Sequence, residues 1–114
     1  MLELLTTLAS VGNMSNMEAA LLIRGRIIYS ELSFAELVLW QLPFPVEGVT
    51  HRFKYRLAYV VKGVCVVRYD NESRKGDHRH FGNTESVYVF VNPEKLMTDF
   101  QADIERWNRE NRGS

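Results

Sequence analysis

Residues 69–80 carry the densest group of reactive side chains in the chain. Two of the three histidines of the sequence, His78 and His80, lie in this stretch together with carboxylates, a phenol and several cations. Because an imidazole exchanges a proton near neutral pH, these histidines are the candidate acid and base. In RNA cleavage without a metal ion, one such group removes the 2′-hydroxyl proton and another protonates the leaving 5′-oxygen. The residue types therefore indicate proton transfer at a phosphodiester.

Phosphodiester cleavage also needs cations at the phosphate and carboxylates that orient the imidazoles. Guanidinium and ammonium groups stabilise the charge of the phosphorane, and a tyrosine can stack on a base or transfer a proton. The candidate catalytic residues are His78, His80, Asp70, Asp77 and Tyr69. The candidate substrate-binding residues are Arg79, Lys75, Arg74, Arg56, Lys54 and Asn71. In this hypothesis Asp70 or Asp77 orients an imidazole, and neither a metal ion nor a cofactor is needed.

Two other interpretations of the same stretch stay open. In an extended chain the two histidines point the same way, so Asp77 or Asp70 could complete a metal site with them. Alternatively, the charged groups pair with one another in a solvated loop, as Asp70 with Arg68. The sequence lacks the Gly-rich phosphate loop, the nucleophile-elbow motif and the paired cysteines that mark other enzyme classes.

Four residues outside this stretch are weighed as further candidates for a site. His51 follows a proline-containing loop, and we expect it at the surface, where it could join the site from a neighbouring strand end. Trp40 and Trp107 fall on apolar patterns that favour the core. The single cysteine, Cys65, has no basic neighbour in sequence, which favours a buried, inert thiol.

The composition is that of one globular domain of 114 residues. Hydrophobic residues make up 46% of the chain, and no apolar run approaches the about 20 residues that cross a bilayer. The net charge is zero, although basic residues exceed acidic ones by four between Arg24 and His80. The global charge therefore indicates no nucleic-acid partner, and the basic groups are concentrated in the middle of the chain.

The N-terminal residues differ in pattern from the rest. Residues 1–17 mix leucines with small polar residues, and the regular pattern begins only after Met17. We expect residues 1–17 to be an extension that is disordered or reflects a mis-called start codon, and residues 18–114 to be one domain. The N-terminus lacks the basic region of a secretory signal, and a single cysteine suits a reducing compartment, so the cytoplasm is the expected location.

Alternating and β-branched residues predict a mostly antiparallel sheet. The predicted strands cover residues 19–30, 33–42, 53–61, 64–70 and 87–91, and residues 71–86 are predicted to form a loop. The order Asn92, Pro93, Glu94 is typical of a helix start, and the helix runs to about Arg109. Its apolar stripe is Leu96, Met97, Phe100, Ile104 and Trp107. The expected fold is α+β, with about five strands and the C-terminal helix packed on one face.

The predicted hairpin around Lys62 and Gly63 determines which side chains share a face. A two-residue turn and a regular ladder would pair Val61 with Val64, Tyr59 with Val66, Arg56 with Tyr69 and Lys54 with Asn71. On this register the core face holds Phe53, Tyr55, Leu57, Tyr59, Val61, Val64 and Val66. The other face would carry Lys54 and Arg56 beside Tyr69 and Asn71.

Several segments of the chain resemble one protein family. They are residues 51–61, residues 66–72 with Tyr69-Asp70-Asn71-Glu72, the run Lys75-Gly76-Asp77-His78-Arg79-His80, Phe90-Val91 and a Trp-containing helix. Over about residues 19–109 the chain is similar to the TumE family of bacterial toxins. The resemblance implies a small cytoplasmic toxin of a type II toxin–antitoxin system, encoded beside a helix-turn-helix antitoxin. It also implies that the shared motif forms the site.

The resulting hypothesis is a toxin that arrests growth as a metal-independent endoribonuclease, by analogy with other small toxins that cleave mRNA. RNA and the antitoxin are the expected partners, no membrane is expected, and a homodimer through a sheet edge or an aromatic patch is an option. Two alternatives remain open. One is a non-catalytic protein that blocks a cellular target or only dimerises and binds its antitoxin, and the other is a metal-dependent nucleic-acid or nucleotide enzyme.

Overall fold

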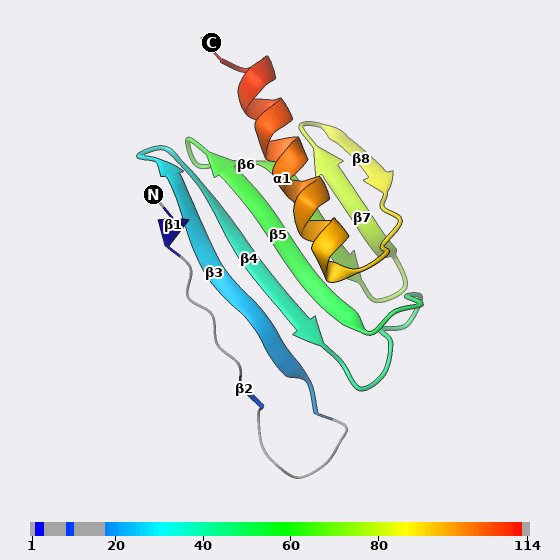
Figure 1. Cartoon of the computed structure of the whole chain (residues 1–114). Helices are drawn as coiled ribbons and strands as arrows, with labels where there is room; N and C mark the ends of the chain where they lie inside the picture. The colour runs from blue at the N-terminus through cyan, green and yellow to red at the C-terminus, as the bar shows by residue number, and fades with distance from the viewer. Residues whose placement is uncertain (1, 4–8, 11–17, 113–114) are drawn as a thin grey trace.

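The computed structural model describes residues 2–3, 9–10 and 18–112, which form an antiparallel sheet and one helix (Figure 1). The predicted α+β class is confirmed. The strands are β1 (Leu2–Glu3), β2 (Ala9–Ser10), β3 (Ala20–Ser30), β4 (Ser33–Gln41), β5 (Phe53–Val61), β6 (Val64–Glu72), β7 (Gly76–Phe81) and β8 (Thr84–Val87), and the helix is α1 (Pro93–Glu110). The predicted extension over residues 1–17 falls largely outside the described residues.

Strands β3 to β8 are neighbours in chain order and form a meander of six strands. Strands β1 and β2 both pair with β3. Strand β7 and most of β8 lie inside the predicted loop over residues 71–86, so the loop prediction is wrong there and the meander has six strands where about five were expected. The side chains of β7 alternate between the two faces of the sheet although all of them are polar or aromatic apart from Gly76. Arg79 contacts α1, whereas His80 faces the other way.

The predicted strand over residues 87–91 is also corrected, because the ladder ends at Val87. The backbone N–H of Tyr88 donates to Asp77 O at 3.0 Å, and the chain then leaves the sheet toward α1. Tyr88 and Phe90 pack against the core, whereas the side chain of Val89 is exposed. The alternation in this segment thus reflects burial beside the sheet and not a strand within it.

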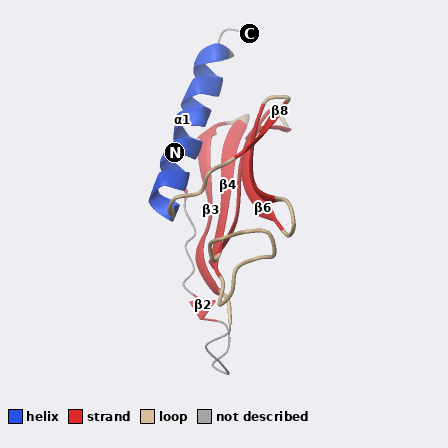
Figure 2. Cartoon of the chain, turned by 90° about the vertical axis from the view of Figure 1, so that its right-hand side faces the viewer, coloured by secondary structure: helices blue, strands red, loops and turns tan. Residues whose placement is uncertain are grey.

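Helix α1 packs on one face of the sheet, as Figure 2 shows in side view. Asn92 Oδ1 accepts a hydrogen bond from Lys95 N at 2.7 Å and Pro93 is the first helical residue, which confirms the predicted helix start. The buried core combines residues of β4, β5, β6 and the helix. It consists of Ala35, Leu37, Leu39, Tyr55, Leu57, Tyr59, Val66, Val67, Tyr69, Leu96, Phe100 and Ile104. The helix does not have the length and apolarity of a membrane span.

Tyrosine hydroxyls fix the helix to this face, which we call the helix face. Four of the five tyrosines of the chain donate to side chains of α1. The pairs are Tyr29 with Gln101 at 2.9 Å, Tyr59 with Asn108 at 2.7 Å, Tyr69 with Asp103 at 2.6 Å and Tyr88 with Asp99 at 2.7 Å. These bonds fix the helix along its length, because apolar packing alone is not directional.

The opposite face of the sheet has no helix against it, and we call it the open face. Strand register and the alternation of side chains define its members. Among them are Arg24, Arg26 and Ile28 of β3, Phe34, Glu36, Val38 and Trp40 of β4, Lys54, Arg56 and Ala58 of β5, Arg68 and Asp70 of β6, His78 and His80 of β7, and Glu85 of β8.

A β-bulge changes the register of the predicted hairpin. The turn is as expected, with Lys62 and Gly63 at φ angles of 52° and 80°, and Val61 lies opposite Val64. Beyond it, Val66 is an extra residue on β6, so that Tyr59 pairs with Val67. The pairing of Tyr59 with Val66 is therefore wrong, and every later pair moves by one residue.

Because of the bulge, the candidate catalytic residue Tyr69 and the candidate substrate-binding residue Asn71 lie on the other side of the sheet from Arg56 and Lys54. Arg56 lies opposite Asp70 and not opposite Tyr69. Tyr69 and Asn71, which are 1% and 0% exposed, are buried on the helix face.

Two burial predictions also change, because Trp40 lies half-buried on the open face and Cys65 is exposed. Trp107 packs against the core as expected.

Candidate functional site

Strand register arranges the open face into rows that cross the sheet. In one row Arg56 lies opposite Asp70, and Asp70 lies opposite His78. The next row contains Arg68 opposite His80 and His80 opposite Glu85. Neighbouring strands are about 4.8 Å apart, so side chains within a row reach one another. The structure thus brings both candidate histidines together with two of the basic residues of the sheet.

His80 lies between a cation and a carboxylate. Its Nε2 is 2.8 Å from Arg68 Nη2 and 3.1 Å from Glu85 Oε2. A guanidinium only donates hydrogen bonds and a carboxylate only accepts them. Neutral His80 with an unprotonated Nε2 therefore accepts from Arg68, whereas His80 protonated at Nε2 donates to Glu85.

His78 is held by a backbone carbonyl beside the same carboxylate. Its Nε2 lies 2.7 Å from Lys75 O, so this nitrogen carries the proton and donates it. The other ring nitrogen, Nδ1, is buried, has no hydrogen-bond partner among the described residues and lies 3.7 Å from Glu85 Oε2. Glu85 thus faces both imidazoles.

Sequence reasoning missed Glu85, because it lies in the predicted loop. The signal that the sequence offered was Gly82 between two polar segments, because glycine is typical of hairpin turns. In the structure Gly82 adopts a φ of 59° in such a turn. That turn places Glu85 opposite His80 on the neighbouring strand.

Tyr69 and Arg79 are not brought together with the histidines. On the helix face, Arg79 Nη2 lies 2.8 Å from Asp103 Oδ1 and Arg79 Nε lies 2.5 Å from Asp103 Oδ2. Tyr69 donates to the same carboxylate at 2.6 Å. Burial raises the pKa of Tyr69, and its bond to Asp103 raises it further, so the phenol stays protonated at neutral pH. Both residues join β6 and β7 to α1.

Asp77 does orient an imidazole, but it is that of His51 on the helix face. Asp77 Oδ2 lies 2.8 Å from His51 Nε2 and accepts a hydrogen bond from the Tyr55 hydroxyl at 2.6 Å. The His51 ring stacks on Phe90 with centroids 3.9 Å apart, and its Nδ1 accepts from Phe53 N at 3.1 Å. Both ring nitrogens are therefore occupied by protein groups, and His51 does not join the open face.

The remaining candidates are divided between the scaffold and the surface. Asn71 accepts from Tyr55 N at 3.0 Å and donates to Phe53 O at 2.6 Å, so its side chain connects β6 to β5. Lys54 lies on the open face and donates to Asn71 O. Arg74 and Lys75 are exposed in the turn between β6 and β7, where they pair with Glu47 at 3.4 Å and Glu72 at 3.9 Å.

Within the described residues, no group of three or more His, Cys, Asp or Glu side chains is arranged to hold a metal ion. Asp77 cannot complete a set with His78 and His80, because it lies on the opposite face. Asp70 lies opposite His78 but makes no hydrogen bond to either histidine of the open face. The charge that faces both imidazoles is that of Glu85.

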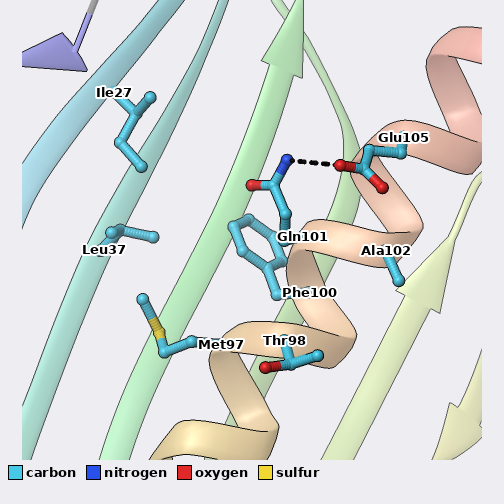
Figure 3. Close-up of a pocket in the computed structure, with 8 residues that line it drawn as sticks. All are labelled: Ile27, Leu37, Met97, Thr98, Phe100, Gln101, Ala102 and Glu105. Carbon is cyan, nitrogen blue, oxygen red and sulfur yellow. Dashed lines mark hydrogen bonds between the residues drawn. The ribbon is translucent and has the colours of Figure 1, made fainter.

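Two of the pockets in the described part of the chain lie on opposite sides of the sheet. The larger, of about 440 Å³, lies between α1 and the strands β3 and β4, with Ile27, Leu37 and Met97 in its wall and Gln101 hydrogen-bonded to Glu105 at 3.4 Å beside it (Figure 3). It contains none of the candidate residues. The smaller, of about 210 Å³, lies on the open face and includes Lys54, Arg56 and Asp70.

The sequence model of a protein family described as toxin TumE matches residues 8–108. The chain belongs to the TumE toxin family. The match includes every candidate residue of the open face, and it begins upstream of residue 19, where the resemblance seen in the sequence begins. No curated protein and no solved structure matches the chain. Membership of the TumE family gives the protein the role of a toxin.

Proposed function

We propose that this TumE protein is a metal-independent endoribonuclease whose active site lies on the open face around His78 and His80. The observation that carries the proposal is the shared position of the two imidazoles beside Glu85, with Arg68 on the neighbouring strand. Two imidazoles and a cation are the groups that acid–base cleavage of a phosphodiester requires.

His80 acts as the general base in this mechanism. A substrate phosphate draws Arg68 away from His80 Nε2, which frees the nitrogen lone pair to take the proton of the 2′-hydroxyl. The 2′-oxygen then attacks phosphorus and the bond to the 5′-oxygen breaks, leaving a 2′,3′-cyclic phosphate. Glu85, 3.1 Å from Nε2, balances the positive charge that His80 acquires.

His78, with both ring nitrogens protonated, acts as the general acid: Nε2 gives its proton to the leaving 5′-oxygen and a neutral imidazole remains. Its Nε2 proton is held by Lys75 O in the free protein, and Glu85 lies on the Nδ1 side of the ring. The cations of the open face stabilise the phosphorane charge, Arg68 directly and Arg56 and Lys54 from the neighbouring strand. Arg79 has no part in this mechanism, because Asp103 occupies its guanidinium.

Growth arrest after induced expression tests the proposal. Replacing His80 with alanine removes the base, so His80→Ala is expected to abolish growth arrest while circular dichroism shows an intact fold. His51→Gln is the matched control, since this histidine lies on the helix face, and it is expected to keep toxicity. Growth arrest by a folded His80→Ala protein would contradict the assignment.

The partners follow from the toxin role. We propose that the protein acts in the bacterial cytoplasm, where RNA is accessible, and that a helix-turn-helix antitoxin encoded beside it neutralises it. Co-expression with the neighbouring gene is expected to restore growth, and the two proteins are expected to copurify. Growth arrest that persists with both genes expressed would contradict this partner.

A further inference from the structure

The smaller pocket of about 210 Å³ lies beside the row that contains His78. Three neighbouring strands of the open face form its walls. They contribute Val38 and Trp40 from β4, Lys54 and Arg56 from β5, and Asp70 and Glu72 from β6. The pocket thus combines an aromatic ring, an aliphatic side chain, cations and carboxylates.

Two groups of this pocket lack partners within the described part of the chain. The Trp40 indole makes neither a hydrogen bond nor a ring contact there, although the sequence pattern had favoured a core position. Arg56 likewise makes neither a hydrogen bond nor an ion pair. A half-buried indole and an unpaired guanidinium on one sheet face are typical of surfaces that bind single-stranded nucleic acid.

Asp70 is the most informative group, because its carboxylate lies in the pocket wall and no described group donates a hydrogen bond to it. It is 9% exposed and accepts no hydrogen bond from any described residue. Its Oδ2 lies 3.2 Å from Arg68 Nε, yet this nitrogen has no hydrogen bond either. The Arg68 guanidinium balances the charge of Asp70, and neither carboxylate oxygen is fully buried, so both oxygens can accept hydrogen bonds from the N–H groups of a ligand.

We propose that this pocket binds a guanine base of single-stranded RNA. Trp40 supplies a stacking surface for the ring, which a single-stranded base can reach because it is not held in a duplex. Asp70 accepts hydrogen bonds from N1–H and from the exocyclic amino group, since guanine presents two adjacent donors on that edge. Lys54 and Arg56 contact the flanking phosphates. The inference rests on the proposed function for the identity of the macromolecule.

The position of the pocket links recognition to cleavage. Asp70 lies directly opposite His78 on the neighbouring strand. A base held by Asp70 therefore places its own ribose or the adjacent phosphate beside the two imidazoles. The expected consequence is cleavage next to guanines in unpaired RNA.

Binding of uncleavable RNA tests the pocket separately from catalysis. The probes are three labelled 2′-O-methyl hexanucleotides of uracil. One carries a single guanine, one carries a single adenine, and one contains uracil alone. Methylation of the 2′-oxygen prevents cleavage. Wild type is expected to bind the guanine oligomer about tenfold more tightly than the other two. In a Trp107→Phe background, where Trp40 is the remaining tryptophan, binding is expected to quench its fluorescence.

Three variants separate stacking from base recognition. Asp70→Asn is expected to remove the guanine preference, whereas Trp40→Ala is expected to weaken all three oligomers by about tenfold. Trp40→Phe should restore part of the binding, which excludes misfolding as the cause. Phe34→Ala is the matched control, because Phe34 lies on the same face against Arg26 and outside the pocket.

The outcomes distinguish the two proposals. Equal affinity of wild type for the three oligomers, or an unchanged guanine preference in Asp70→Asn, would overturn the guanine pocket. If wild type nevertheless cleaves unmodified RNA, the proposed ribonuclease stands without it. Guanine-selective binding without cleavage of unmodified RNA would overturn the ribonuclease function and leave the pocket in place.

Discussion

Arg79 and Asp103 form a two-pronged ion pair that joins β7 to α1. The two nitrogen–oxygen distances are 2.8 Å and 2.5 Å, and both side chains are largely buried. The two neighbours of Arg79 in sequence, His78 and His80, point to the other side of the sheet. Within this motif Arg79 therefore belongs to the scaffold, whereas His78 and His80 belong to the candidate site.

Arg79→Ala is expected to lower the free energy of unfolding by about 2 to 3 kcal/mol, because it leaves the Asp103 carboxylate without its guanidinium. Urea unfolding measures the loss. Arg74→Ala is the matched control, since its pair with Glu47 at 3.4 Å is 79% and 69% exposed, and a change within about 0.5 kcal/mol is expected. Equal effects of the two substitutions would contradict the scaffold role.

Asn71→Ala is expected to destabilise the protein by about 1 to 3 kcal/mol, because Tyr55 N and Phe53 O lose their partner. Asn71→Asp keeps the acceptor for Tyr55 N but loses the donor to Phe53 O, so an intermediate value is expected. Thermal or urea unfolding compares both with Asn83→Ala in the exposed turn. A neutral Asn71→Ala would show that the side chain does not connect the strands.

Stability is expected to fall as the pH rises above about 10, the ordinary value for tyrosine. Burial, together with hydrogen bonds to Asp77, Asp103 and Asp99, raises the pKa of Tyr55, Tyr69 and Tyr88 in the folded protein. A raised folded-state pKa gives stability that is complete below the unfolded value and is lost above it. Urea midpoints at pH 7, 9 and 11 measure this, and equal midpoints at pH 7 and 11 would contradict it.

Glu85→Gln is expected to slow RNA cleavage by about tenfold or more and to change the pH dependence of the rate, because it removes the charge that faces both imidazoles. Rates across pH 5 to 9 measure the effect. Glu105→Gln, on the helix, is the control and is expected to behave like wild type. An unchanged rate and pH profile in Glu85→Gln would exclude the carboxylate from the mechanism.

Local rules were sufficient for the elements whose signals lie close together in sequence. Lys62 and Gly63 adopt the positive φ angles that a two-residue turn requires, and Asn92 caps the helix as expected. The bulge at Val66 was not predicted, because no glycine or other local signal marks an extra residue in that run of valines. Strand β7 was not predicted either, because its residues are polar and its partners are β6, β8 and Asp103 of the helix.

The site was predictable to the extent that it follows strand alternation. His78 and His80 are two residues apart and share a face, as the spacing indicates. Which face Tyr69 and Asp77 occupy depends on register and on partners more than 20 residues away, such as Asp103 and His51. Glu85 and Trp40 were not selected, because neither is part of the reactive stretch in the sequence.

RNA integrity in the presence of purified protein tests the central claim most directly. Wild type and the His78→Ala/His80→Ala double variant are incubated with the same RNA, with and without chelator, after brief induced expression has shown which of them arrests growth. Cleavage by wild type alone, undiminished by chelator, is expected, with loss of cleavage in a folded double variant. Intact RNA despite growth arrest, or cleavage by the double variant, would contradict it.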